Sequence, residues 1–208
     1  MKNQSNFINH IRPRFIAKGA LSFVYTFCLG GLTFLAFLVL CITGLLLMFH
    51  YQPGESTGFS SLLNIASVIP YGGVIRNIHF WAGQVIVLTV NLHMVRVVWT
   101  HSYKPPKQLN WLVGVGLLLL VLILDFTGYL LRGSQESGAA ATVAVGILEL
   151  IPGIGLPISQ ILLGRPSALG GSTLIIYVWH CFLFPLIAFL LQLYHFWRIR
   201  KDGGVRPL

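Results

Sequence analysis

Hydrophobic positions along the chain fall into four long runs separated by more polar stretches. The runs cover about residues 21–49, 77–99, 111–131 and 173–197. Each is long enough to cross a hydrocarbon core of about 30 Å as an α-helix. No internal repeat or low-complexity tract interrupts the pattern. It predicts an all-α membrane protein whose four-transmembrane-helix bundle, residues 21–197, follows an N-terminal segment, 1–20, and precedes a tail, 198–208.

The connection between the third and fourth runs, residues 132–171, is longer than the other connections. It contains the mostly apolar stretch VAVGILELIPGIGLPISQILLG, which is broken at Pro152, Gly153, Gly155 and Pro157. Apolar segments too short to span, on either side of a Pro/Gly break, favour two short helices lying at the membrane surface.

Composition and charge agree with a membrane location. The chain is 55% hydrophobic and only 9% charged, and its mean hydropathy is +0.78, which is unusual for a soluble protein. Most basic residues lie in the N-terminal segment, near the 100–110 loop and in the tail: Lys2, Arg12, Arg14, Lys18, Arg96, Lys104, Lys107, Arg198, Arg200, Lys201 and Arg206. Both termini are therefore expected on the negative, cytoplasmic side of a bacterial or equivalent energy-transducing membrane. No basic soluble domain suggests nucleic-acid binding.

Four histidines lie inside the predicted spans and form two pairs. His79 and His93 are fourteen residues apart in the second span, and His180 and His195 are fifteen apart in the fourth. Both spacings are close to four helical turns, so each pair shares a face and is separated by about 21–22 Å along the axis. Both helices run inward, which places His79 and His180 near the outer surface and the other two near the inner surface.

Two facing histidines at each depth suggest haem ligation. A six-coordinate haem takes neutral imidazoles on opposite sides of its iron, and side chains on facing helices of a bundle provide them. The pattern predicts two haems stacked across the membrane. The alternative is that the histidines pack through hydrogen bonds or relay protons.

Glycines repeat with the same period as the histidines. Gly30 and Gly44 in the first span, and Gly114 and Gly128 in the third, are fourteen residues apart. Because these helices run outward, Gly44 and Gly128 fall at the depth of the outer histidines, and Gly30 and Gly114 at the depth of the inner ones. Positions without a side chain would leave room for a porphyrin edge. Glycine also serves close packing of transmembrane helices, which is the alternative.

Several segments carry a family resemblance. IRNIHFWAGQ, LHMVRV, the FTGY that ends the third span, WHCFLFPLI and YHFWRIRKDGG resemble the N-terminal four-helix half of cytochrome b in quinol-oxidising Rieske/cytochrome b complexes. Within that family, the opening FCLGGLTF, the fifteen-residue histidine spacing and the ending GGVRPL look most like cytochrome b6. The resemblance runs from about residue 20 to the C-terminus.

The resemblance implies particular cofactor ligands. His79 and His180 would bind the outer haem b, and His93 and His195 the inner one. Cys28, in the stretch CLGG, would attach a third haem, of the c type, through one thioether beside the inner quinone site. A lone cysteine in an apolar helix is otherwise a small packing residue, as we expect Cys41 and Cys181 to be.

Two arginines lie three residues from histidines of the second span. Arg76 and Arg96 could pair with haem propionates, since the guanidinium fork suits carboxylates. The alternative is that both extend to the membrane interface. Where cytochrome b6 commonly has arginine after the first histidine, this chain has Phe80, so one propionate contact would be absent.

The chain departs from the family after the third span. In TGYLLRGSQESGAAATVA the usual proline, tryptophan and aromatic residues of the outer quinol-oxidation pocket are replaced. The second half of that pocket normally belongs to a separate C-terminal subunit. Asp125, near the outer end of the third span, is expected to pair with Arg132 or to accept a proton, and we favour the pairing.

The function implied by this resemblance is transmembrane electron transfer. Quinol would be oxidised outside, and electrons would pass through two bis-histidine haems to quinone at the inner side. Partners would be a subunit IV-like membrane protein and either a Rieske iron–sulfur protein or a c-type cytochrome subunit, in a dimeric complex.

Two other functions remain open. One is a dihaem membrane anchor of a dehydrogenase or hydrogenase, or of a quinol:multihaem cytochrome c complex without a Rieske protein. The other is a haem-free transporter or assembly subunit, in which the histidines relay protons or pack.

Overall fold

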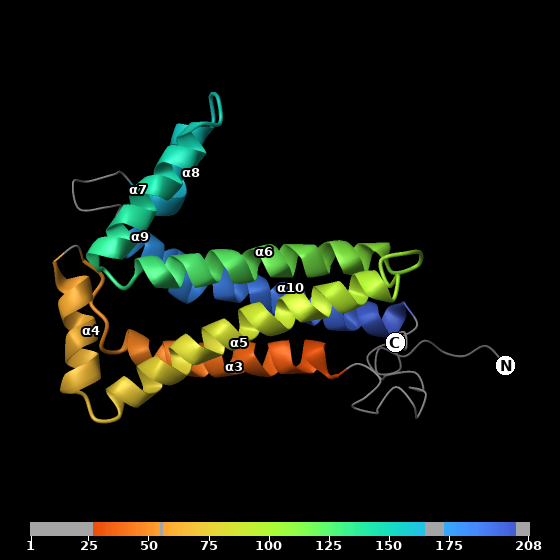
Figure 1. The fold of residues 1–208 in the computed structure, drawn as a ribbon, viewed down its shortest axis with the longest axis horizontal. Helices are drawn as coiled ribbons and strands as arrows, with labels where there is room; N and C mark the ends of the chain where they lie inside the picture. Colours follow the sequence, from red (N-terminus) through yellow and green to blue (C-terminus); the bar gives the residue numbers. More distant parts are fainter. Residues whose placement is uncertain (1–26, 55, 165–172, 203–208) are drawn as a thin grey trace, which may run out of the picture.

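The fold is a bundle of four long helices. A computed structural model describes residues 27–54, 56–164 and 173–202. Within them lie α3 (Leu29–Met48), α5 (Gly72–Trp99), α6 (Gln108–Leu130) and a composite last helix. They run side by side (Figure 1), and each has the length and apolar composition needed to cross a membrane. The prediction of an all-α membrane protein with four spanning helices is confirmed. Segment 1–20 and residues 203–208 of the tail lie outside the described residues.

The composite fourth span contains an irregular turn. It consists of α9 (Thr173–Val178), the π-helical turn η2 (Trp179–Leu183) and α10 (Phe184–Lys201). His180 lies in the π-helical turn and His195 in α10. Such turns in α-helices often occur at functional sites.

Within the described residues the first span consists of α3, which begins at Leu29. Its predicted start at residue 21 lies outside the described part of the chain. Phe27 and Cys28 have φ values of 50° and 48°, in the left-handed region that interrupts a right-handed helix.

A short helix, α4 (Thr57–Ser67), lies across one end of the bundle (Figure 1) and was not predicted. With eleven residues it is too short to span, and polar residues interrupt its apolar pattern. Its last turns approach the beginning of α5 so closely that any Cβ on Gly72 would collide with the Ile65 carbonyl. Glycine therefore permits the close approach. We refer to this side of the molecule as the α4 end.

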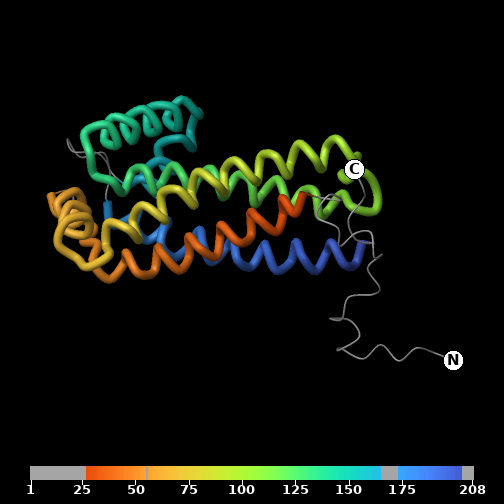
Figure 2. Tube along the Cα trace, turned by 60° about the horizontal axis from the view of Figure 1, so that its bottom comes forward, coloured from red at the N-terminus to blue at the C-terminus, as the bar shows by residue number. Residues whose placement is uncertain are grey.

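Two more helices form a hairpin between the third and fourth spans, as predicted. α7 (Gln135–Glu149) and α8 (Gly155–Leu163) pack on each other and lean away from the bundle at the α4 end (Figures 1 and 2). The chain turns between them at Gly153, whose φ is 77°. Ser134 caps α7 by accepting a hydrogen bond from the backbone N–H of Ser137.

A packed cluster joins these elements at the α4 end. It contains Tyr51, Ile65, Leu130, Leu131, Ala141, Val145, Leu163 and Ile176. The Tyr51 hydroxyl donates to the Leu131 carbonyl at 2.8 Å, and its ring stacks on that of Tyr177. Burial raises the pKa of Tyr51 to about 12. A second cluster, Ala36, Ile86, Val90 and Val121, lies within the bundle.

Candidate functional site

The predicted outer histidines meet across the bundle near the α4 end, and we call them the first pair. The ring centroids of His79 and His180 are 6.4 Å apart, with an angle of 72° between the ring planes. Two metal–imidazole bonds of about 2 Å on opposite sides of one ion would set the ring centres about 6 Å apart. The spacing of the first pair therefore fits an iron held between two imidazoles.

The predicted inner histidines form a second pair toward the other end. His93 and His195 are close enough to interact electrostatically. Near them, the ring of Phe34 on α3 lies edge-to-face against that of Phe196 on α10, with centroids 5.1 Å apart. The structure thus brings together the two histidine pairs that the sequence spacing suggested.

The π-helical turn explains how unequal spacings give matching pairs. In an α-helix, fourteen residues fall about 40° short of four full turns, whereas fifteen overshoot by about 60°. One π-helical turn takes up a single extra residue. Because Trp179–Leu183 is such a turn, the fifteen-residue interval from His180 to His195 presents its rings much as the fourteen-residue interval in α5 does.

Each predicted glycine lies against one histidine of its predicted pair. A Cβ on Gly44 would be 3.2 Å from His79 Cε1, and one on Gly128 would be 2.8 Å from His180 Cε1. At the second pair the corresponding distances are 3.3 Å from Gly30 to His93 and 3.5 Å from Gly114 to His195. The glycines therefore make room for the imidazole rings themselves.

Two threonines that we did not predict hold the first pair. Thr43 Oγ1 lies 2.8 Å from His79 Nδ1, and Thr127 Oγ1 lies 3.0 Å from His180 Nδ1. Both threonines are buried. Each directly precedes a glycine of the repeat, so the recurring dipeptide Thr-Gly is the sequence signal that would have revealed them.

The second pair has no equivalent contacts. The Nδ1 atoms of His93 and His195 are buried and have no hydrogen-bond partner. The residues before the corresponding glycines are Leu29 and Val113, which carry no hydroxyl. An unpartnered buried donor is costly in a bare protein, so this pair is the less complete of the two.

The two predicted propionate-binding arginines differ in their surroundings. Arg96 is only 7% exposed and lies close enough to His93 to interact with it electrostatically. Arg76 is half-buried and lines a cavity of about 70 Å³ together with Arg132. Apolar side chains of α4 complete this cavity: Phe59, Leu62, Leu63 and Ala66.

The expected pairing of Asp125 with Arg132 is wrong. Both residues lie in the described part of the chain, and no ion pair joins them. Helix α6 ends at Leu130, and the Arg132 guanidinium beyond it lies over the Tyr129 ring, 5.3 Å from its centroid. The Asp125 carboxylate instead faces Gly83 on α5, where a Cβ would be 3.7 Å away.

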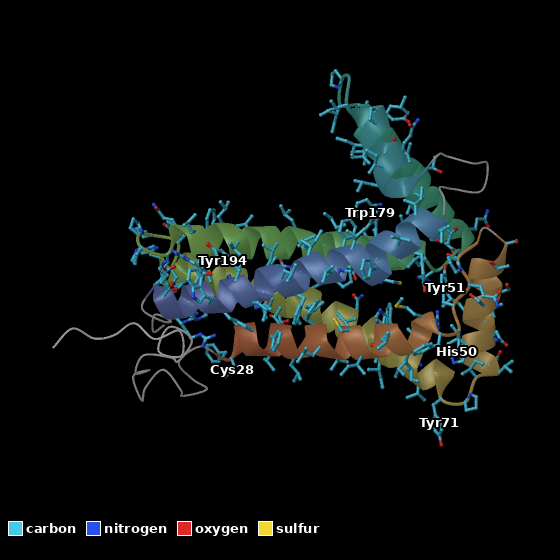
Figure 3. All side chains as sticks on the ribbon, turned by 180° about the vertical axis from the view of Figure 1, so that it is seen from behind. Cys28, His50, Tyr51, Tyr71, Trp179 and Tyr194 are labelled. Carbon is cyan, nitrogen blue, oxygen red and sulfur yellow. The ribbon has the colours of Figure 1, made fainter. Side chains whose placement is uncertain are left out.

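Cys28 lies at the opposite end of α3 from His50 and Tyr51, as Figure 3 shows. It is exposed and directly precedes the helix. Gly30, two residues further on, contacts His93, so Cys28 is at the end of the bundle that holds the second pair. In the described part of the chain, no three His, Cys, Asp or Glu residues converge to hold a metal ion. Paired imidazoles suit an iron whose other four ligands come from a porphyrin.

Fold and site thus define a membrane-spanning helical bundle with two facing histidine pairs. Residues 17–203 match the family described as cytochrome b/b6/petB. The chain is 38% identical over 182 residues to cytochrome b6 of Heliomicrobium gestii. The aligned residues cover 88% of this chain and 85% of that protein. Over the same shares of both chains it is 39% identical to cytochrome b6 of Heliobacterium mobile. The chain belongs to the cytochrome b/b6 family, whose members bind haem b in quinol-oxidising complexes.

A solved structure shows the same fold. A chain of the "Hyperthermophilic respiratory Complex III" superposes with a TM-score of 0.76 at 24% sequence identity. The match covers 96% of this chain and 52% of that one. The present chain therefore spans about half the length of its structural relative.

Proposed function

We propose that this chain is a transmembrane electron-transfer subunit, which passes electrons between an outer and an inner quinone site through two haems b. The observation that carries the proposal is the first pair. Its rings face each other at 6.4 Å, and glycines of the two other spans make room for them. When bound, haem b carries single electrons by alternating between ferric and ferrous iron.

The protein's own residues would bind, orient and insulate these groups. His79 and His180 would hold one iron, and His93 and His195 the other. Arg96 would bind a propionate beside the second pair, and Arg76 one beside the first, because the planar guanidinium matches a carboxylate. The apolar bundle would keep water away and so hold the local dielectric low.

Cys28 is proposed to carry a third haem. Its thiol is exposed and lies at the end of the bundle that holds the second pair, where it would hold that haem through a thioether. Exposure distinguishes it from Cys181, which is half-buried within the fourth span. The inner quinone would bind at this end.

Orientation and partners complete the proposal. Both termini would lie on the negative side of an energy-transducing membrane, because the positive-inside rule puts short basic segments there. A subunit IV-like membrane protein would be its partner, as the similarity to cytochrome b6 suggests. A Rieske protein or a c-type cytochrome would accept electrons at the α4 end, and the complex would be dimeric.

The experiment that tests this proposal measures haem stoichiometry. The complex is purified from its native membrane and extracted with acid acetone, and pyridine haemochrome spectra are taken of the extract and the residue. We expect two extractable haems b per chain and one haem retained on the polypeptide. Two haems with none retained would remove the role of Cys28, and no haem at all would overturn the electron-transfer function.

A further inference from the structure

We infer that the hydroxyls of Thr43 and Thr127 lower the reduction potential of the haem held by the first pair. This inference rests on the proposed function, because it concerns how the chain tunes two bound haems. Both threonines act through the histidines and are positioning residues.

The hydrogen-bond chain at Thr43 fixes which nitrogen of His79 carries the proton. The Thr43 hydroxyl has one hydrogen, which it donates to the Val39 carbonyl at 2.7 Å. Its lone pairs therefore face His79 Nδ1 at 2.8 Å, and this contact is a hydrogen bond only if Nδ1 donates. Nε2 is then left without a proton and available to iron.

Thr127 repeats this arrangement on the other side. Its hydroxyl donates to the Ile123 carbonyl at 2.8 Å and accepts from His180 Nδ1 at 3.0 Å. Both rings of the first pair are thus held in the same tautomer and in fixed orientations before any cofactor is considered.

The second pair lacks this support, although its helices and spacing are similar. Its Nδ1 atoms have no hydrogen bond, and Leu29 and Val113 occupy the positions equivalent to the two threonines. Backbone carbonyls approach three of the four rings: those of Leu40 and Leu124 lie near His79 and His180, and that of Asn110 lies near His195. A hydroxyl on Nδ1 is found at both rings of the first pair and at neither ring of the second.

A ligand histidine whose other N–H is donated becomes a stronger electron donor. Stronger donation stabilises ferric over ferrous iron, and hydrogen bonding around the ligands is one of the means by which proteins set reduction potentials. The two hydroxyls would therefore favour the oxidised form of the haem held by the first pair.

The test is a potentiometric titration of both haems b in the intact purified complex. Thr43→Val and Thr127→Val keep the shape of the side chain and remove the hydroxyl. We expect each to raise the potential of the first-pair haem and leave that of the second unchanged. An effect of one hydrogen bond corresponds to about a tenfold change in the ferric-to-ferrous ratio, or about 59 mV for one electron. Thr43→Ser and Thr127→Ser should restore the potential.

Thr142→Val is the matched control, because this exposed threonine of α7 bonds only to the Gly138 carbonyl. The converse variant is Val113→Thr, which adds a hydroxyl before Gly114 and should lower the potential of the second-pair haem. This variant keeps the inference testable if a valine variant loses its haem.

Unchanged potentials in the valine variants, with both haems present, would overturn the inference. The Nδ1–H groups of the first pair would then donate their hydrogen bonds to backbone carbonyls. Equal shifts at both haems would also overturn it. Failure of the proposed function is distinguishable, since the unmodified complex would then contain no haem b to titrate.

Discussion

The two histidine pairs share a frame but differ in what holds their rings. Each has one histidine from α5 and one from the fourth span, and each faces glycines from α3 and α6. Only the first pair has a hydroxyl on each Nδ1, whereas the Nδ1 atoms of the second pair are buried and unbonded. Equal spacing along a helix therefore does not make two sites equivalent. The protein alone orders one of them, and the other depends more on what it binds.

The residues around the first pair are also more tightly held by the protein than those around the second. At the α4 end, a packed cluster joins α4, α6, α7, α8 and α9, and Tyr51 is hydrogen-bonded to Leu131 within it. Near the second pair, the buried charged group is Arg96. The first pair is expected to keep its geometry without haem better than the second.

The largest effect should come from removing one ligand of either pair. His79→Leu and His93→Leu each leave one imidazole where a six-coordinate haem needs two. We expect each variant to retain one of the two extractable haems b. Comparing the reduction potential of the retained haem with the two potentials of the original complex should identify the pair that was lost. Pyridine haemochrome content and redox titration measure this. Retention of both haems in either variant would contradict the ligand assignment.

Cys28→Ala should have the next largest effect, confined to the second-pair end. We expect it to abolish the haem that stays on the polypeptide after acid acetone and to leave two extractable haems b. Haem staining of the denatured chain measures the change. Cys41→Ala, within α3, is the control and should alter nothing. Covalent haem that persists without Cys28 would exclude it as the attachment site.

Alanine at the glycines should produce graded losses that sharpen the comparison. A Cβ would be 2.8 Å from His180 at Gly128 but 3.5 Å from His195 at Gly114. The first distance requires the ring to move, whereas the second is ordinary contact, and overpacking typically costs about 1–3 kcal/mol. Gly128→Ala should therefore reduce haem occupancy of the first pair, and Gly114→Ala should leave the second nearly full. The opposite order in quantitative haem spectra would contradict the geometry.

The smallest expected effect concerns Tyr51. Tyr51→Phe removes its bond to the Leu131 carbonyl and should cost about 1 kcal/mol of stability at neutral pH. Burial raises the pKa of Tyr51 to about 12, above the unfolded value of about 10. Its contribution is therefore full below about pH 10 and is lost as pH rises through 12.

Thermal unfolding of the detergent-solubilised protein between neutral pH and pH 12 measures this effect. The original chain should lose stability over that alkaline interval more steeply than the phenylalanine variant. Parallel losses in both proteins would show that Tyr51 does not titrate as its burial requires.

The sequence allowed the fold and the relation between histidines and glycines to be predicted because both depend on periodicity. Spans follow from apolar length, and residues fourteen apart on a helix share a face. α4 was missed because an eleven-residue helix with interrupted apolar positions has too weak a pattern. Thr43 and Thr127 were missed because a threonine in an apolar helix is usually satisfied by its own backbone, as both of these are in part.

The ion pair between Asp125 and Arg132, predicted across the end of α6, is the interaction that was predicted incorrectly. Asp125 and Arg132 are seven residues apart, which would place them on one face if α6 continued. The helix ends at Leu130, so Arg132 turns onto Tyr129 and Asp125 faces α5. The bound haems, the role of Cys28 and the orientation in the membrane stay predictions, because each depends on molecules other than this chain.

The π-helical turn at Trp179–Leu183 has a consequence for how the fourth span can vary in length. An additional residue in a straight α-helix rotates every following side chain by about 100°, which would turn His195 out of the bundle. The wider turn confines that rotation to five residues. Within the bilayer, where a lipid-exposed loop is not tolerated, the span can thus accommodate one residue more than its partner helix while both of its histidines still face the same interior.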